Sequence, residues 1–124
     1  MEDVFSSTSY GDPETPIFTA NVGEAVRFRV LKPSGHGRQH AFTIHGAEWL
    51  HHAWASGSNS SRIGPNDHSS VLGTQGGASV MRAWNITPIG GAGGLFRVPG
   101  DYLYVDQPSR MMADGLWGIF RVSP

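Results

Sequence analysis

Cysteine is absent from the 124 residues of this chain. Its absence excludes disulfides, catalysis by a thiolate, zinc sites built from four thiolates, and any metal centre that requires a sulfur anion. It says nothing about the redox compartment, because a chain without cysteine tolerates reducing and oxidising surroundings alike. The chain also has no apolar run near the roughly 20 residues that a transmembrane helix needs, so we expect no membrane partner.

Charge is scarce and dispersed. Only 15% of the residues are charged, the formal net charge is −1, and the cations are Lys32 and eight arginines spread along the chain. Binding to a phosphate backbone requires a clustered basic face, and the sequence shows none. We therefore expect no nucleic-acid partner. The hydrophobic fraction of 39% also excludes a segment kept disordered by its charge.

Glycine and proline are abundant, with 17 and 8 residues, and they follow no collagen-like period. Such a composition indicates many turns between short strands rather than long helices. Residues 1–16 are polar and rich in turn-forming residues, which predicts an N-terminal arm or linker. The rest of the chain, residues 17–124, has the length of a single domain with one core.

Two segments show the alternation of apolar and polar residues that is typical of half-buried strands. In residues 25–31, apolar side chains alternate with two arginines. In residues 40–45, alternation places His40, Phe42 and Ile44 on one face and Ala41, Thr43 and His45 on the other. Further strands are expected at residues 17–20, 79–86, 95–98, 101–105 and 116–122.

Helices are expected only as a turn or two at residues 108–113. The Ser/Gly-rich residues 55–79 lack apolar periodicity and predict a long, exposed excursion. Seven or so short strands joined by turns predict an all-β fold, a Greek-key β-sandwich or barrel.

Six histidines form the most conspicuous chemical feature. Five of them lie within seventeen positions: His36, His40, His45, His51 and His52. Neutral imidazole is the commonest metal ligand, so this cluster suggests a copper or zinc site. Histidines in turns and on edge strands are also ordinary surface residues. His40 and His45 point to opposite faces of a regular strand, so they cannot share one metal within it.

Two motifs resemble the cupredoxin domains of multicopper oxidases. The segment Gln39-His40-Ala41-Phe42-Thr43-Ile44-His45-Gly46 is similar to the family's H-P-x-H-x-H-G, and the strand Gly23-Glu24-Ala25-Val26-Arg27-Phe28-Arg29-Val30 is similar to the family's preceding strand. Residues 99–104 and 115–122 resemble the framework P-G-x-[YW]-x-[YF] and G-[ML]-x-G-x-[FI]-x-V, with a matching gap between them. The resemblance extends from about Pro16 to Val122, and it implies a cupredoxin-like fold.

The same resemblance implies that most copper ligands are lost. His40 matches a type 1 copper histidine and His45 matches a histidine of the trinuclear cluster. Val105, Asp106 and Gln107 occupy the family's H-C-H positions, and Met111 occupies the second type 1 histidine position. A blue copper site needs a thiolate, which the carboxyl group of Asp106 cannot replace. We therefore expect the type 1 site to be lost.

Two roles follow from these assignments. We expect His40 to donate a hydrogen bond to Asp106, so that this pair replaces the metal as a local structural link. His45 is expected to be either a polar interface residue or a vestigial ligand that a neighbouring domain completes.

The resemblance further implies a parent that is a periplasmic or secreted oxidoreductase. This chain shows no signal peptide, so we expect it to be one domain of a longer protein. Its expected role is architectural, its partners neighbouring cupredoxin domains or a second copy of itself. We assign no catalytic residue, expect no oxidase activity of the isolated chain, and expect copper only in the parent family.

Two other functions remain open at this stage. One is a non-blue copper or zinc module, with ligands drawn from His36, His40, His51, His52 and Asp106. The other is a carbohydrate- or protein-binding sandwich that uses the tryptophans and tyrosines as a stacking platform. For most of these aromatic residues, packing in the core is the competing interpretation.

Overall fold

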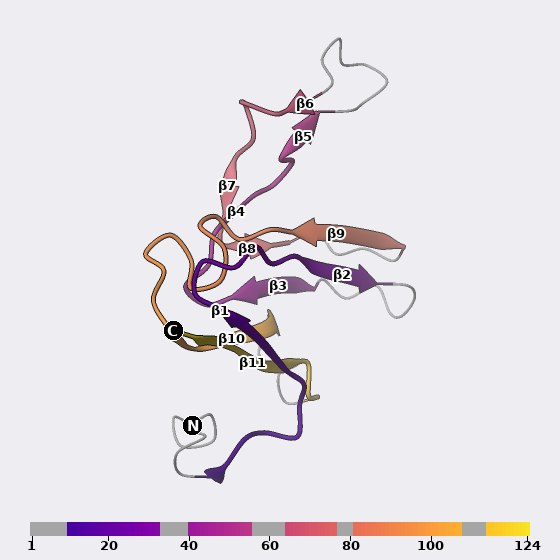
Figure 1. Ribbon diagram of the computed structural model, residues 1–124. Helices are drawn as coiled ribbons and strands as arrows, with labels where there is room; N and C mark the ends of the chain where they lie inside the picture. The colour runs from indigo at the N-terminus through magenta and orange to yellow at the C-terminus, as the bar shows by residue number, and fades with distance from the viewer. Residues whose placement is uncertain (1–9, 33–39, 56–63, 77–80, 108–113) are drawn as a thin grey trace.

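The computed structural model describes residues 10–32, 40–55, 64–76, 81–107 and 114–124. Within these ranges the regular elements are strands, arranged as a sandwich with a projecting arm (Figure 1). The all-β expectation is confirmed. The expected helical turn at residues 108–113 lies outside the described residues. No helix in the described ranges is long and apolar enough to cross a membrane.

In the part of the chain that the structure describes, the larger sheet contains five strands in the order β1-β11-β10-β3-β8. β1 pairs with β11 in parallel, and the other neighbours are antiparallel. The strands span Ile17–Asn21 (β1), Ala41–Ile44 (β3), Thr74–Gln75 (β8), Gly100–Gln107 (β10) and Trp117–Ser123 (β11). The expected strands at 17–20, 40–45, 101–105 and 116–122 are present here with shifted ends.

The smaller sheet pairs β2 (Phe28–Lys32) with β9 (Arg82–Ile86). Both strands alternate, and the inner face carries Phe28, Val30, Trp84 and Ile86, which pack on the core. The core between the sheets includes Ile44, Phe120 and Val122 from the larger sheet and Ile86 from the smaller one. Burial of these side chains is the main favourable term that holds the two sheets together.

The expected excursion at residues 55–79 is only partly a loop. β4 (Trp49–Leu50) pairs with β7 (Val71–Leu72), and β5 (Trp54–Ala55) pairs with β6 (Gly64–Pro65). These two ladders form an arm that extends away from the sandwich (Figure 1). The same segment then supplies β8 to the larger sheet, which its composition did not indicate.

One expected strand is wrong. Residues 95–98 form a turn, and the large apolar side chains of Leu95, Phe96 and Val98 are exposed there. The expected turn at residues 88–94 is confirmed. Gly91 in this turn has a φ of +79°, and a Cβ atom there would lie 2.6 Å from the carbonyl oxygen of Glu24. The position therefore requires glycine on steric grounds.

Candidate functional site: the His40–Asp106 pair

The antiparallel pairing of β3 with β10 brings His40 and Asp106 together. His40 immediately precedes β3, and Asp106 is the second-last residue of β10. In the register of the two strands, Asp106 is opposite Phe42 and Gln107 is opposite Ala41. The start of β3 therefore lies beside the end of β10, although the two residues are 66 positions apart.

The carboxyl group of Asp106 accepts two hydrogen bonds. Its Oδ2 contacts Nδ1 of His40, and its Oδ1 accepts from the backbone N–H of Ala41 at 2.8 Å. The side chains of His40 and Asp106 are 22% and 16% exposed, so both are largely withdrawn from water. The backbone of Asp106 is held by its own N–H, which donates to the carbonyl of Leu116 at 2.9 Å. The contact expected between His40 and Asp106 is present.

These residues do not fit a type 1 copper ion. Such a site requires two imidazoles and a thiolate, and the chain contains no cysteine. Among the described residues, the imidazole of His40 and the carboxyl group of Asp106 stand at this position; they are hydrogen-bonded to each other, and the second carboxyl oxygen accepts from the N–H of Ala41. Met111, the remaining position implied by the family resemblance, lies outside the described residues. The arrangement is therefore a satisfied polar link between two strands.

The other histidines are not gathered around this pair. His45 is exposed at the far end of β3, where its backbone N–H donates to Leu103. His51 and His52 are exposed on the arm, with stacked rings whose centroids are 4.0 Å apart. His36 lies outside the described residues. Among the residues that the structure describes, no three His, Cys, Asp or Glu side chains are grouped to hold a metal ion.

The two faces of β3 differ as the alternation predicts. Phe42 and Ile44 pack into the sandwich core, and Ile44 is only 1% exposed. Thr43 points to the other face, where its hydroxyl is hydrogen-bonded to that of Thr74 on β8 at 2.9 Å. His45 lies in the turn that follows β3 and is exposed. His40 precedes the strand and His45 follows it, so the two histidines are at opposite ends of β3.

The tryptophans divide between core and surface. Trp49 is 1% exposed, and its indole N–H donates to Oε1 of Gln75 at 3.4 Å. Trp84 packs against the core. Trp54, on the arm, is 59% exposed. These three tryptophans therefore do not form a shared stacking platform.

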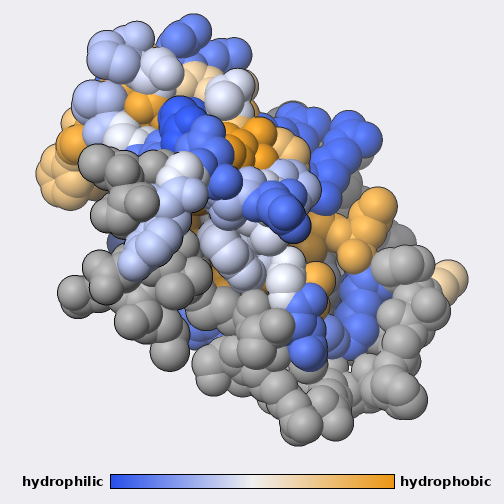
Figure 2. Space-filling model, turned by 90° about the horizontal axis from the view of Figure 1, so that it is seen from below, coloured by the Kyte–Doolittle hydropathy of each residue, from blue (hydrophilic) through white to orange (hydrophobic). Residues whose placement is uncertain are grey.

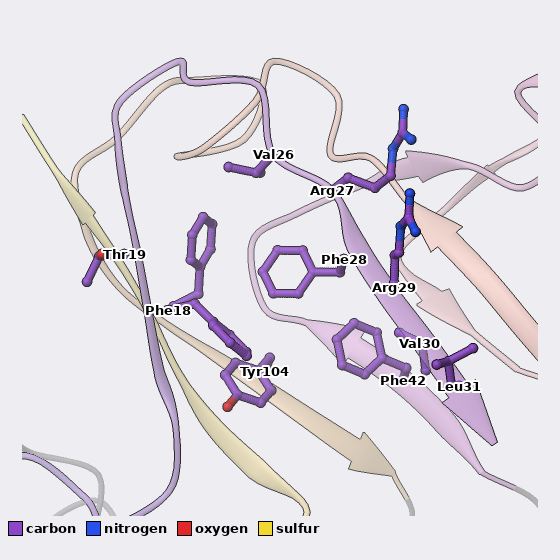
Figure 3. A pocket seen from close by; sticks show the side chains of 11 residues that line it. Phe18, Thr19, Val26, Arg27, Phe28, Arg29, Val30, Leu31, Phe42 and Tyr104 are labelled. Atoms are coloured by element: carbon purple, nitrogen blue, oxygen red, sulfur yellow. The ribbon is translucent and has the colours of Figure 1, made fainter. Parts of the chain in front are cut away.

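Sequence reasoning missed an apolar cavity of about 550 Å³ between β1 and β2. We name it the aromatic hollow; its walls include Phe18, Val26, Phe28, Phe42, Tyr104 and Phe120. Figure 3 shows the rings of Phe18, Phe28, Phe42 and Tyr104 gathered around the hollow. The ring centroids of Phe18 and Phe28 are 5.9 Å apart and their planes are nearly perpendicular. This is a favourable aromatic geometry.

Tyr104 connects the aromatic hollow to Pro16, the residue just before β1. Its hydroxyl donates to the backbone carbonyl of Pro16 at 2.6 Å, and burial raises its pKa above the ordinary value of 10.0. The alternation of residues 25–31 and 40–45 places Phe28 and Phe42 on inner faces. Nothing in the sequence around Phe18 indicated that its ring would be 48% exposed at the mouth of a cavity.

Comparison with known proteins identifies the fold. No protein-family model and no curated protein matches this sequence. Among solved structures, auracyanin B is similar over 90% of this chain and 79% of its own, at 18% identity and a TM-score of 0.50. A dithionite-reduced auracyanin from the photosynthetic bacterium Roseiflexus castenholzii is similar over 90% of this chain and 86% of its own, again at 18% identity and 0.50.

Auracyanins are cupredoxins, so this chain has a cupredoxin-like fold. The expected fold class is confirmed, and the likeness extends to the fold alone. Fold does not determine function, which must be argued from the residues of the site.

Proposed function

We propose that this chain is a cupredoxin-like unit of a multicopper oxidase that has lost its type 1 copper and serves an architectural role. In this proposal, the His40–Asp106 pair replaces the lost metal as the link between β3 and β10. The unit packs against neighbouring cupredoxin domains in the parent. The isolated chain has no oxidase activity.

The observation that carries this proposal is that both carboxyl oxygens of Asp106 are hydrogen-bonded within the chain. One of the two partners is the histidine that the family resemblance assigns to copper. Polar groups that are withdrawn from water are normally hydrogen-bonded, and each oxygen of this carboxyl group has such a partner within the chain. The absence of cysteine supports the same conclusion, because no other side chain supplies the thiolate that type 1 copper requires.

The same proposal includes a role for His45 and a cellular compartment for the parent protein. His45 is exposed in the turn after β3, as an interface residue must be. There it serves as a polar contact, or as one ligand of a cluster that a neighbouring domain completes. The parent is periplasmic or secreted in this proposal, in keeping with the implied family.

A metal-binding module with a non-blue site is the competing function. Nδ1 of His40 is hydrogen-bonded to Asp106, so a metal ion at this position would bind Nε2 of His40 or displace one of the present partners. On the arm His51 and His52 are stacked and His68 is also exposed, but the described residues contain no group of three side chains placed to hold a metal ion. We therefore place this function second.

A metal titration separates the two functions. The chain is purified without a histidine tag and titrated with Cu(II) and with Zn(II), by calorimetry and by electron paramagnetic resonance for copper. We expect no tight 1:1 binding of Cu(II) or Zn(II) that depends on His40, and no turnover of phenolic laccase substrates. His40→Ala is the site variant and His52→Ala is the matched control on the arm. Tight 1:1 nitrogen-coordinated copper that disappears in His40→Ala would refute the proposal.

A further inference from the structure

Residues 12–16, the segment just before β1, lie against the larger sheet, and we call this segment the strap. In Figure 1 the chain ahead of β1 turns back below β11. Figure 2 shows the molecule from below, where hydrophilic residues are exposed among hydrophobic ones. Side chains of the larger sheet hold the strap at its first residue, Asp12, and at its last, Pro16. The strap is therefore docked on the sheet at both ends.

Arg121 on β11 holds the first residue of the strap. Its Nη1 and Nη2 donate to the two carboxyl oxygens of Asp12 at 3.0 and 2.7 Å. Its Nε and Nη2 donate to the carboxyl oxygens of Asp101 on β10 at 2.8 and 2.9 Å. The hydrogen bonds to Asp101 and Asp12 raise the pKa of Arg121, which therefore stays charged. Isolated surface ion pairs contribute little, but bidentate arginine pairs and charge networks such as this one contribute measurably.

The last residue of the strap is held beside a glycine. The hydroxyl of Tyr104 on β10 donates to the carbonyl of Pro16 at 2.6 Å, and Gly118 on β11 lies directly opposite Tyr104. A Cβ atom at Gly118 would lie 2.5 Å from that same carbonyl oxygen, closer than Cβ atoms come in real structures. The missing side chain at Gly118 therefore provides the room in which Tyr104 reaches Pro16.

Between these two anchors the strap buries a hydroxyl group without a partner. Oγ1 of Thr15 is buried, and it makes no hydrogen bond among the residues that the structure describes. A buried polar group that is left unpaired costs free energy, because it has given up its hydrogen bonds to water. The docked state is therefore favoured by the two anchors and opposed by Thr15, whose hydroxyl regains water when the strap is lifted.

The strap anchors the start of β1. In the described part of the chain, β1 lies at the edge of the larger sheet and pairs with β11. The far end of β1 continues into a turn that is tied to the sandwich, where the N–H of Val22 donates to the carbonyl of Ser123 at 2.8 Å. At the near end, Ile17 follows Pro16 directly. Lifting the strap therefore allows β1 to fray from its first residue.

We propose that the strap is an electrostatic latch, a segment that alternates between a docked and a released state, and that its release loosens β1. The side chains of Asp12 and Arg121 are 49% and 33% exposed, so dissolved salt weakens their attraction and favours release. β1 carries Phe18, so release also loosens one wall of the aromatic hollow. The inference depends neither on the His40–Asp106 pair nor on the proposed function.

Amide hydrogen exchange, followed by mass spectrometry, tests the latch on the full chain. The exchange rate of the β1 amides is measured against that of the β9 amides, which lie in the other sheet. Asp12→Asn is expected to accelerate exchange in β1 by about two- to fivefold and to leave β9 unchanged. Glu14→Gln is the matched control, because Glu14 is an exposed acid on the same strap. Unchanged exchange in Asp12→Asn, or equal acceleration by Glu14→Gln, overturns the inference.

A second variant and a salt series test the balance between the two states. Thr15→Val removes the unpaired hydroxyl and keeps the side-chain shape, so exchange in β1 is expected to slow by about threefold or more. Raising NaCl from about 0.02 M to about 0.5 M is expected to accelerate exchange in β1 of the native chain more than in Asp12→Asn. Exchange in Thr15→Val that is not slower, or an equal salt response in both chains, overturns the inference. Either result leaves the copper titration, and hence the proposed function, unaffected.

Discussion

Removing the carboxyl group of Asp106 tests whether the His40–Asp106 pair is a structural link. Asp106→Ala leaves the Nδ1 of His40 and the backbone N–H of Ala41 without their present acceptor. Both groups sit where the side chains of His40 and Asp106 are only 22% and 16% exposed, so water replaces the lost partner incompletely. Asp106→Asn retains an acceptor for Ala41 and is expected to be milder.

The magnitude follows from the two lost contacts. A hydrogen bond contributes about 0.5–1.5 kcal/mol net, and a buried donor left without a partner costs about 1–3 kcal/mol. Because the site is partly rather than fully buried, we expect Asp106→Ala to lower the free energy of unfolding by about 2–3 kcal/mol. For a domain of this size that corresponds to a fall in Tm of about 6–12 °C. Asp106→Asn should lower the free energy by about 1 kcal/mol.

Equilibrium unfolding in guanidinium chloride, followed by tryptophan fluorescence, measures these changes. A double-mutant cycle of His40→Ala and Asp106→Ala isolates the energy of the pair, expected at about 1 kcal/mol. Asp67→Ala is the matched control, because Asp67 is an exposed acid on the arm. The reasoning is refuted if Asp106→Ala unfolds within about 0.5 kcal/mol of the native chain, the range of ordinary surface substitutions.

Two further predictions concern other parts of the sandwich. Gly91→Ala is expected to lower the free energy of unfolding by about 2–4 kcal/mol, because a Cβ there would lie 2.6 Å from the oxygen of Glu24. Gly11→Ala, at a similar φ but in open space, should cost about 1 kcal/mol, and equal losses would contradict the steric explanation. Burial raises the pKa of Tyr104 above 10.0, so the unfolded chain ionises first and stability falls as pH rises past about 10. Denaturant unfolding between about pH 8 and pH 11.5 should show a shallower alkaline loss in Tyr104→Phe, and an unchanged slope would count against this assignment.

β2 and β3 could be predicted from the alternation in the sequence, because one face of each strand packs on the core. Phe28, Val30, Phe42 and Ile44 occupy that face, which determines which positions are apolar. Residues 95–98 include three apolar residues but form a turn instead of a strand. Flanking glycines and the positive φ of Arg97 set the backbone of this turn, so its apolar side chains are exposed instead of buried. An apolar run by itself does not distinguish a half-buried strand from an exposed turn.

The arm and β8 could not be predicted because long-range contacts define them. β8 is two residues long, and it joins the sheet through Thr74 beside Thr43 and through Gln75, which accepts from the buried indole of Trp49. Residues 55–79 show no local pattern that anticipates such partners. The His40–Asp106 contact, in contrast, could be predicted, because the family resemblance aligns both residues with ligands of one metal.

The parallel pairing of the first and last strands has a mechanical consequence. The ladder between β1 and β11 begins at Ile17 with Ile119 and ends at Asn21 with Ser123. The chain enters this ladder at one end and leaves it at the other. Tension applied at the start of β1 and at the end of β11 therefore pulls the two strands past each other along their length. The hydrogen bonds of the ladder then bear the force together.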